Sequence, residues 1–216
     1  MRLYHYLESK WALDDIRRRR IKLSQIDDTN DPFELKCVFS RHNLTQTAIE
    51  QTGSGLAESF SAVCFSHDWD SILMWSHYGD RHKGICLGFD VLEEITRPID
   101  YVRQPILVEN LIVEEGGDFP IKDATNAVNS LLGTKYEGWF YEKEIRVHTE
   151  RAEIDEETGQ YFADFSERVR LAEVIAGARF PLSKKPIVDA LEDYSDVEIY
   201  KARAAADKFE IVRGRW

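Results

Sequence analysis

The stretch that decides the fold class is residues 60–90, FSAVCFSHDWDSILMWSHYGDRHKGICLGFD. It begins with an apolar, β-prone run that is typical of a buried strand. Asp68 or Asp70 can cap a helix from Ser71 to His82, and Gly84 to Asp90 then returns as a strand. The stretch therefore predicts a strand, helix, strand unit.

Outward from this unit, strands and helices are interspersed without a regular repeat. The predicted strands are 3–7, 21–24, 33–39, 140–148, 169–176, 197–201 and 209–213, and 100–115 contains β-rich apolar runs. The predicted helices are one from Ser9 to the arginines 17–20, one over 44–60 interrupted at 53–55, one over 124–132, and one over 184–194 capped by Ser183. This pattern predicts an α+β fold, with a mixed or antiparallel central sheet and flanking helices, as a single domain over 1–216.

Composition and charge narrow the function classes. The 216 residues are 43% hydrophobic, enough for a folded core, and three cysteines cannot form a disulfide framework. No apolar run approaches the ~18 residues of a membrane span and the first residues lack a signal peptide, so we expect a cytoplasmic protein without a membrane partner. A net charge of -11 disfavours nucleic acid, although it does not exclude it. The Arg17–Arg20 run is interpreted as cations that complement the carbonyl end of a helix dipole rather than as a phosphate contact.

Common catalytic signatures are absent from the sequence. There is no phosphate-binding G-x-x-x-x-G-K-[ST], no G-x-G-x-x-G, no H-E-x-x-H and no G-x-S-x-G. Cys64, His67, His82 and Cys86 have spacings that resemble a four-ligand zinc site. Because the two cysteines lie in apolar strands and the segment between them is better explained as a helix, we predict no metal site.

Two further stretches carry candidate chemistry. In the predicted helix, Trp75, Tyr78 and His82 share a face, which suits either ordinary packing or a pocket for a planar ligand. A neighbouring stripe holds Met74, His77 and Arg81. On the predicted strand 140–148, alternation places Glu142, Glu144, Arg146 and His148 on one face. That face is either a solvated surface with ion pairs or a rigid carboxylate, oriented by a guanidinium, that stabilises positive charge on a substrate.

A polar loop follows the second predicted strand. Residues 27–32, DDTNDP, are dense in turn formers, and Pro32 disfavours a helical Asp31. We therefore expect an ordered loop from Asn30 to Glu34, with Asn30 or Asp31 hydrogen-bonded to backbone.

Four ordered motifs resemble the bacterial DUF2971 family of unknown function. They are NDPFE (30–34), CFS (64–66), MWSHYGD with HKG (74–80 and 82–84) and WFYEKEIR (139–146). The resemblance runs from Leu3 to the C-terminal strands, and it implies no established reaction.

A more distant similarity is to ADP-ribosyltransferases of the diphtheria-toxin type. These enzymes use a His on the first strand, a Tyr on a helix and a Glu on a later strand, and the corresponding order here is His5, Tyr78, Glu144. The resemblance implies an NAD-dependent ADP-ribosyltransferase or NAD glycohydrolase, in which His5 contacts ribose, Tyr78 stacks on nicotinamide and Glu144 stabilises an oxocarbenium-like species. The residues assigned to NAD binding are His5, Asn30, Ser66, Trp75, Tyr78, His82 and Arg146.

Other interpretations remain open at this point. One alternative is a non-catalytic ligand-sensing or regulatory domain, for example in a phage-defence or toxin system. A second is a metal-independent nuclease that uses His77, His82 and Glu144 as acid-base groups, which conflicts with the acidic charge. The sequence identifies neither the acceptor of a transferase nor whether Glu142 or Glu144 is the key carboxylate.

Overall fold

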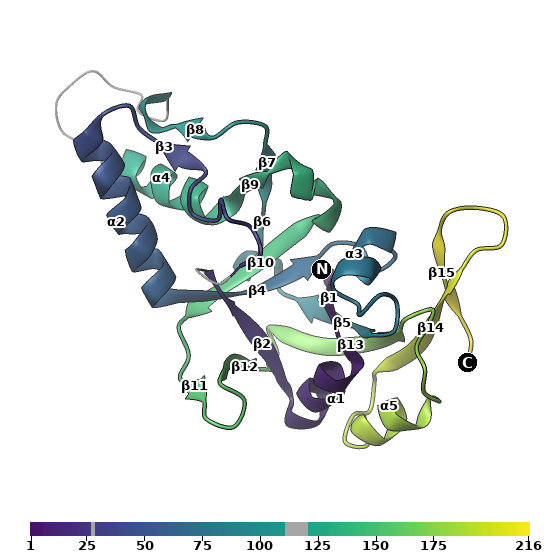
Figure 1. Ribbon diagram of the computed structural model, residues 1–216. Helices are drawn as coiled ribbons and strands as arrows, with labels where there is room; N and C mark the ends of the chain where they lie inside the picture. Colours follow the sequence, from purple (N-terminus) through teal and green to yellow (C-terminus); the bar gives the residue numbers. More distant parts are fainter. Residues whose placement is uncertain (27–28, 111–120) are drawn as a thin grey trace.

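The computed structural model describes residues 1–26, 29–110 and 121–216, with side chains described from residue 125 onward in the last range. In this part of the chain, eleven strands form one sheet (Figure 1). They are β1 (Arg2–Leu7), β2 (Arg20–Gln25), β4 (Phe60–Ser66), β5 (Ile85–Val91), β6 (Arg97–Pro98), β10 (Glu144–Glu150), β11 (Ile154–Asp155), β12 (Gln160–Asp164), β13 (Val169–Ala176), β14 (Glu198–Ala204) and β15 (Ile211–Gly214). The main order is β11-β12-β2-β4-β1-β5-β13-β14-β15, with β10 beside β4 and β6 beside β10.

All of these pairings are antiparallel except that of β13 with β14. Two small parallel pairs join β3 (Val38–Phe39) to β8 (Ile106–Leu107) and β7 (Asp100–Val102) to β9 (Thr134–Tyr136). The predicted α+β class with a mainly antiparallel sheet and flanking helices is therefore confirmed.

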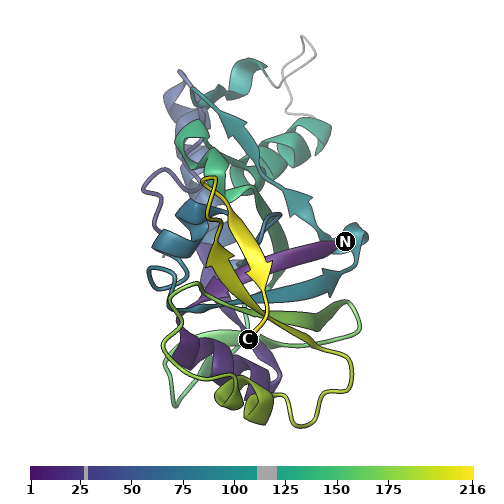
Figure 2. The same cartoon turned by 90° about the vertical axis from the view of Figure 1, so that its right-hand side faces the viewer.

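Within the described residues, the helices are α1 (Ser9–Arg18), α2 (Asn43–Ser59), α3 (Ile72–His77), α4 (Ile121–Gly133) and α5 (Lys185–Ala190), together with the 3₁₀ segments η2 (Glu93–Ile95), η3 (Val108–Asn110) and η4 (Glu137–Glu142). Four of these α-helices form two neighbouring pairs, and α3 lies between them beside β1 (Figure 1). Helices α1 and α5 lie side by side in one pair, and α2 and α4 make the other (Figures 1 and 2). No helix in the described ranges is long and apolar enough to cross a membrane.

Both faces of the central strands are buried, as β5 illustrates. Ile85, Leu87 and Phe89 belong to the core that α1 and α5 cover. Cys86 points the other way into a second cluster, where Trp75 is fully buried. Because alternate side chains on a strand face opposite sides, both sides of β5 remove apolar surface from water.

The arginine run ends α1 as the helix-dipole interpretation requires. Arg17 and Arg18 occupy the last turn, and Arg19 closes the helix in a left-handed conformation with φ of 53°. Arg20 is buried and paired with Asp14 at 3.0 Å and with Asp155 at 2.7 Å. These ion pairs hold Arg20, at the start of β2, against α1 and β11.

The predicted helix from Ser71 to His82 is wrong in length, since α3 ends at His77. Ser71, rather than an aspartate, caps it by accepting a hydrogen bond from the Met74 amide. A Cβ atom at Gly79 would lie 2.6 Å from Trp75 Cε3, and Asp80, Arg81 and His82 all have positive φ. The chain therefore turns back tightly over Trp75 instead of continuing as a helix.

The predicted strand over 33–39 is also wrong, because only Val38–Phe39 is a strand. The Glu34 amide donates to the Asp31 carbonyl at 3.1 Å, and the Lys36 amide donates to the Phe33 carbonyl at 2.8 Å. Leu35 has φ of 58°. These short-range hydrogen bonds make consecutive turns, which override the alternating pattern.

Three further boundaries differ from the predictions. Helix α2 passes through 53–55 without a break. Once a helix has formed, each further residue adds one backbone hydrogen bond, which favours continuing through this segment. The segment 140–148 begins in η4, and the strand starts only at Glu144. Helix α5 spans Lys185–Ala190 without a side-chain cap from Ser183. The predicted runs over 100–115 extend into residues outside the described ranges.

Candidate functional site

A cavity lies where β1 and β2 diverge from the same edge of β4. Strand β1 pairs with β4 at Ser66, whereas β2 pairs with it at Ala62 and Ser61. Strand β10 covers the whole opposite edge of β4. The fork encloses a cavity of about 290 Å³, lined by residues of all four strands and of the loop after β2.

His5 occupies the fork. Its Nδ1 lies 2.9 Å from the Cys64 carbonyl oxygen, which can only accept a hydrogen bond, so the proton sits on Nδ1. Burial lowers the pKa of His5, aided by the charge of Lys22, and this keeps the ring neutral. Its Nε2 is buried without a partner among the described residues. The neutral ring therefore lines the cavity with its proton held by the Cys64 carbonyl and with an Nε2 that is closed off from solvent.

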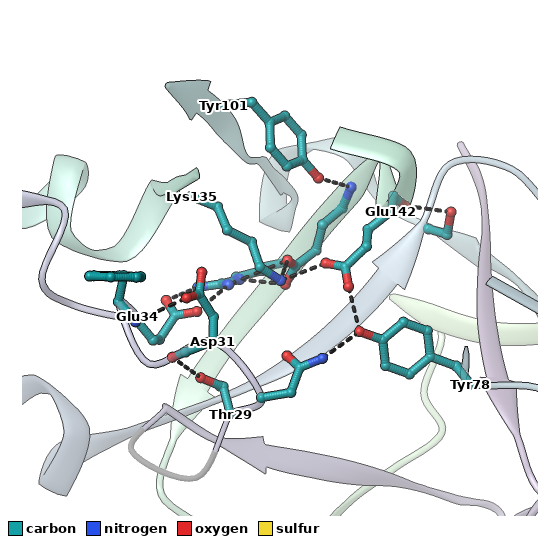
Figure 3. Close-up of polar contacts among 12 residues, drawn as sticks. Thr29, Asp31, Glu34, Tyr78, Tyr101, Lys135 and Glu142 are labelled. Atoms are coloured by element: carbon teal, nitrogen blue, oxygen red, sulfur yellow. Dashed lines mark hydrogen bonds and ion pairs between the residues drawn. The ribbon is translucent and has the colours of Figure 1, made fainter. Parts of the chain in front are cut away.

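Two carboxylates share one ammonium group on the opposite wall. Lys135 Nζ, from β9, lies 2.5 Å from Glu142 Oε2 and 2.9 Å from Glu144 Oε2. All three side chains are buried and line the cavity. Figure 3 shows Lys135 and Glu142 pointing toward one another, with Glu34 and Tyr78 reaching in from either side. The polar face of strand β10 is thus a buried ionic network and not a solvated surface.

Arg146 extends the network to the loop after β2. Its Nε donates to Glu144 Oε1 at 2.6 Å, and its two terminal nitrogens donate to Glu34 at 2.7 and 2.9 Å. Parallel contacts of this kind fix the orientation of both groups. Three carboxylates face two cations in this buried network, so it carries one excess negative charge.

The pKa values of the two carboxyl groups in the pair are displaced in opposite directions. Burial opposes ionisation of Glu144, but Arg146 and Lys135 together lower its pKa to about 2. Burial raises the pKa of Glu142, and Lys135 only partly offsets that effect. Glu144 is therefore a fixed anion, while Glu142 is the stronger base.

Backbone contacts hold both carboxylates in place. Lys143 between them has φ of 43°, and its side chain pairs with Asp68. Ser66 Oγ donates to the Glu142 carbonyl at 2.7 Å, and the Glu144 amide donates to the Tyr101 hydroxyl at 2.8 Å. A fixed backbone limits how far the carboxylates can move.

Tyr78 connects the carboxylate pair to the polar loop. It closes α3, and its hydroxyl donates to Glu142 Oε1 while accepting from Asn30 Nδ2 at 2.6 Å. Burial raises the pKa of Tyr78, so the phenol stays protonated. The expected order in this loop is confirmed at Asp31, whose Oδ1 accepts from the Phe33 amide at 2.9 Å. Asp27 and Asp28 lie outside the described residues.

The structure brings together five of the residues predicted from sequence. They are His5, Asn30, Tyr78, Glu144 and Arg146, all of which line the cavity. The other three do not line it. Trp75 is fully buried and donates from Nε1 to the Trp69 carbonyl, and His82 stacks on Trp75 with ring centroids 6.3 Å apart. Ser66 donates a hydrogen bond to the Glu142 carbonyl. Trp75, Tyr78 and His82 therefore do not form one ligand-binding face, because the turn at Gly79 redirects His82.

Sequence reasoning missed three contributors to the site, Glu34, Tyr101 and Lys135. Glu34 stands in the NDPFE motif, but its predicted strand gave no reason to aim it at Arg146. Tyr101 and Lys135 come from the short pair β7 and β9. No motif marks a lone lysine on a three-residue strand, so only the spatial arrangement identifies it.

The described residues contain no group of three or more His, Cys, Asp or Glu side chains that could hold a metal ion. Cys64 and Cys86 are free thiols. Burial raises the pKa of both thiols, which makes them poor nucleophiles. Besides the Cys64 thiol, the ionisable groups that line the cavity are carboxylates, an imidazole, phenols, ammonium groups and the Arg146 guanidinium.

Together, the fold and the cavity define an α+β protein with a buried carboxylate pair at a strand fork. Residues 74–106 match the family model described as DUF2971, protein of unknown function, which confirms the resemblance to that family over this segment. The motifs at 30–34, 64–66 and 139–146 lie outside the match. No curated protein and no solved structure matches the chain. The resemblance to ADP-ribosyltransferases therefore has no support from these comparisons.

Proposed function

We propose that this cavity cleaves the N-glycosidic bond between nicotinamide and ribose in NAD or a related nucleotide. The proposal includes both transfer to an acceptor group and hydrolysis by water. It depends on one observation: Glu142 and Glu144 face the same cavity with their pKa values displaced in opposite directions. Such separation is typical of a pair in which one carboxylate stays charged and the other exchanges a proton.

The chemistry balances with these two groups. When the C–N bond breaks, its electron pair goes to the positively charged nicotinamide nitrogen, which leaves as a neutral ring. Ionised Glu144 stabilises the positive charge that develops on the ribose, as fixed charges in a dry site can do strongly. Glu142 accepts the proton of the attacking water or acceptor hydroxyl as the new C–O bond forms.

The remaining cavity residues position the substrate in this scheme. The neutral His5 ring lies against the ribose as a polar part of the cavity lining. The ring of Tyr78, fixed at its hydroxyl by Asn30 and Glu142, offers a face for nicotinamide to stack on. Excess negative charge in the network favours the cationic ring of the oxidised cofactor.

A non-catalytic ligand-binding domain is the second candidate, and one observation favours it. Each oxygen of the carboxylate pair already has a partner: Tyr78 and Lys135 for Glu142, and Arg146 and Lys135 for Glu144. A substrate hydroxyl must share or displace one of these bonds. Under this alternative the network shapes the pocket and never reacts.

The deciding experiment compares two buried carboxylates. Glu144→Gln should lower nicotinamide release by about 10²-fold or more while NAD binding, measured by calorimetry, changes little. Glu173→Gln is the matched control, because Glu173 is fully buried between Arg2 and Arg213, at 2.9 and 2.8 Å, on β13 outside the cavity. Both variants should lose stability, so both are assayed below their unfolding transitions.

The two proposals predict different outcomes. Loss of release in Glu144→Gln but not in Glu173→Gln supports catalysis. A folded wild-type protein that binds NAD without releasing nicotinamide supports the binding domain. Absence of both binding and release contradicts the NAD proposal.

A further inference from the structure

Lys22 is a cation on the wall of the cavity that faces the carboxylates. It lies on β2, is exposed, and lines the cavity. Within the described ranges its ammonium group has no ion-pair partner. Its neighbour Arg20, two positions earlier on the strand, is by contrast paired with Asp14 and Asp155.

The carboxylates and the Lys22 ammonium group line different walls of the cavity. Its acidic residues, Glu34, Glu142 and Glu144, come from the loop after β2, from η4 and from β10. The wall formed by β2 and β12 carries Lys22 together with the uncharged polar residues Ser24, Gln25 and Gln160. Strands β2 and β10 flank opposite edges of β4. A ligand that spans the cavity therefore meets carboxylates at one end and an unpaired ammonium group at the other.

His5 also lines the cavity. Its Nδ1 donates to the Cys64 carbonyl, and its Nε2 is buried and unpaired among the described residues, so the ring is neutral and polar. The charge of Lys22 acts on the imidazole, which places the two side chains within electrostatic range. The lining of the cavity therefore favours a ligand that places a hydroxyl group next to His5 and an anionic group next to Lys22.

We propose that Lys22 binds a phosphate group of the ligand whose hydroxylated sugar lies against His5 and the carboxylate pair. The ligand class is a phosphorylated ribose, as found in a nucleotide, and this assignment of the sugar end rests on the function proposed above. A lysine suits this role because its ammonium is a point charge with three donors. Because Lys22 is exposed, salt should weaken the contact.

The first test uses inorganic pyrophosphate alone, so it does not depend on catalysis. Nuclear magnetic resonance titration of the wild type should shift the backbone amides of Lys22 and Ser24. Lys22→Gln should bind about fivefold to tenfold more weakly, in line with loss of one charge-assisted hydrogen bond. Lys83→Gln is the matched control, since Lys83 is an exposed lysine on the turn after α3 and is not a lining residue. Equal affinities in wild type and Lys22→Gln would overturn the phosphate site.

The second test separates this proposal from the proposed function. Nicotinamide release is measured from nicotinamide mononucleotide, which carries a phosphate, and from nicotinamide riboside, which does not. Lys22→Gln should raise the KM for the mononucleotide about tenfold more than the KM for the riboside. Pyrophosphate binding at Lys22 without release from either substrate keeps the phosphate site and refutes the glycosidic function. Suppose instead that nicotinamide is released from both substrates and that Lys22→Gln leaves both KM values equal to those of wild type. This result keeps the glycosidic function and refutes the phosphate site.

Discussion

Arg146 holds Glu34 through two parallel hydrogen bonds, 2.7 and 2.9 Å long, although 112 positions separate the residues. Glu34 belongs to the loop after β2, and Arg146 belongs to β10. Both side chains are buried. This pair therefore fixes the polar loop against the strand that carries Glu144, and it closes one end of the cavity.

Removing one partner of this pair should destabilise the protein strongly. In Glu34→Gln, Arg146 keeps Glu144 but loses its bidentate partner, so we expect the free energy of unfolding in urea to fall by about 3 kcal/mol. Arg103→Gln is the control, because the Arg103 to Glu137 pair is largely exposed and should contribute little. A fall in Glu34→Gln no larger than that in Arg103→Gln would contradict a stabilising role for the buried pair.

The sequence predicts the sheet better than it predicts the site. Strands such as β5 and β13 are rich in apolar, β-prone residues, and local pattern is enough to find them. The pairing of Glu34 with Arg146 and the approach of Lys135 depend on contacts that no local pattern encodes. His5, Tyr78 and Glu144 were found because a resemblance supplied their order, and they line one cavity.

The failures have local causes as well. Alternation over 33–39 predicts a strand, but hydrogen bonds from Glu34 and Lys36 to residues three positions earlier make turns instead. Helical spacing continues past His77, but close packing at Gly79 stops the helix. At 33–39 the long-range pairing of Glu34 with Arg146 also opposes the local strand pattern, whereas at Gly79 the deciding contact is with Trp75, four positions earlier.

Gly79 offers a direct test of this explanation. Gly79→Ala places a methyl group 2.6 Å from Trp75 Cε3, inside a fully buried ring system, so thermal and urea unfolding should show a loss of about 1–3 kcal/mol. Gly55→Ala, at an exposed position in α2 with no atom within 4 Å of the new Cβ, should instead stabilise by about 0.5–1 kcal/mol. Equal effects of the two substitutions would show that the turn under Trp75 does not require glycine.

Asp15 should make stability depend on pH. It is buried in α1, its Oδ2 has no partner among the described residues, and burial raises its pKa to about 7 despite the nearby charge of Arg20. The folded protein therefore binds a proton between about pH 4 and pH 7 that the unfolded chain has released. Because stability falls with rising pH wherever the folded state binds more protons, this contribution is fully present below about pH 4 and lost as pH rises through 7.

The measurement compares wild type with Asp15→Asn, which keeps the shape of the neutral acid. The variant should gain stability relative to wild type as the pH is raised from 5 to 8, as followed by urea unfolding at each pH. At lower pH a separate loss is expected, because Glu144 has a pKa of about 2 and its stabilising charge disappears as the pH falls from about 4.5 toward 2. A constant difference between wild type and Asp15→Asn from pH 5 to pH 8 would show that Asp15 is ionised throughout.

The protonation of His5 can be tested without any substrate. Since the Cys64 carbonyl fixes the proton on Nδ1 and burial lowers the pKa, nitrogen chemical shifts should show a protonated Nδ1 and an unprotonated Nε2 at pH 6. His67, which is exposed beside Asp68, is the internal reference for an imidazole in contact with solvent. A proton found on Nε2 in the wild type would contradict the hydrogen bond that Nδ1 donates to the Cys64 carbonyl.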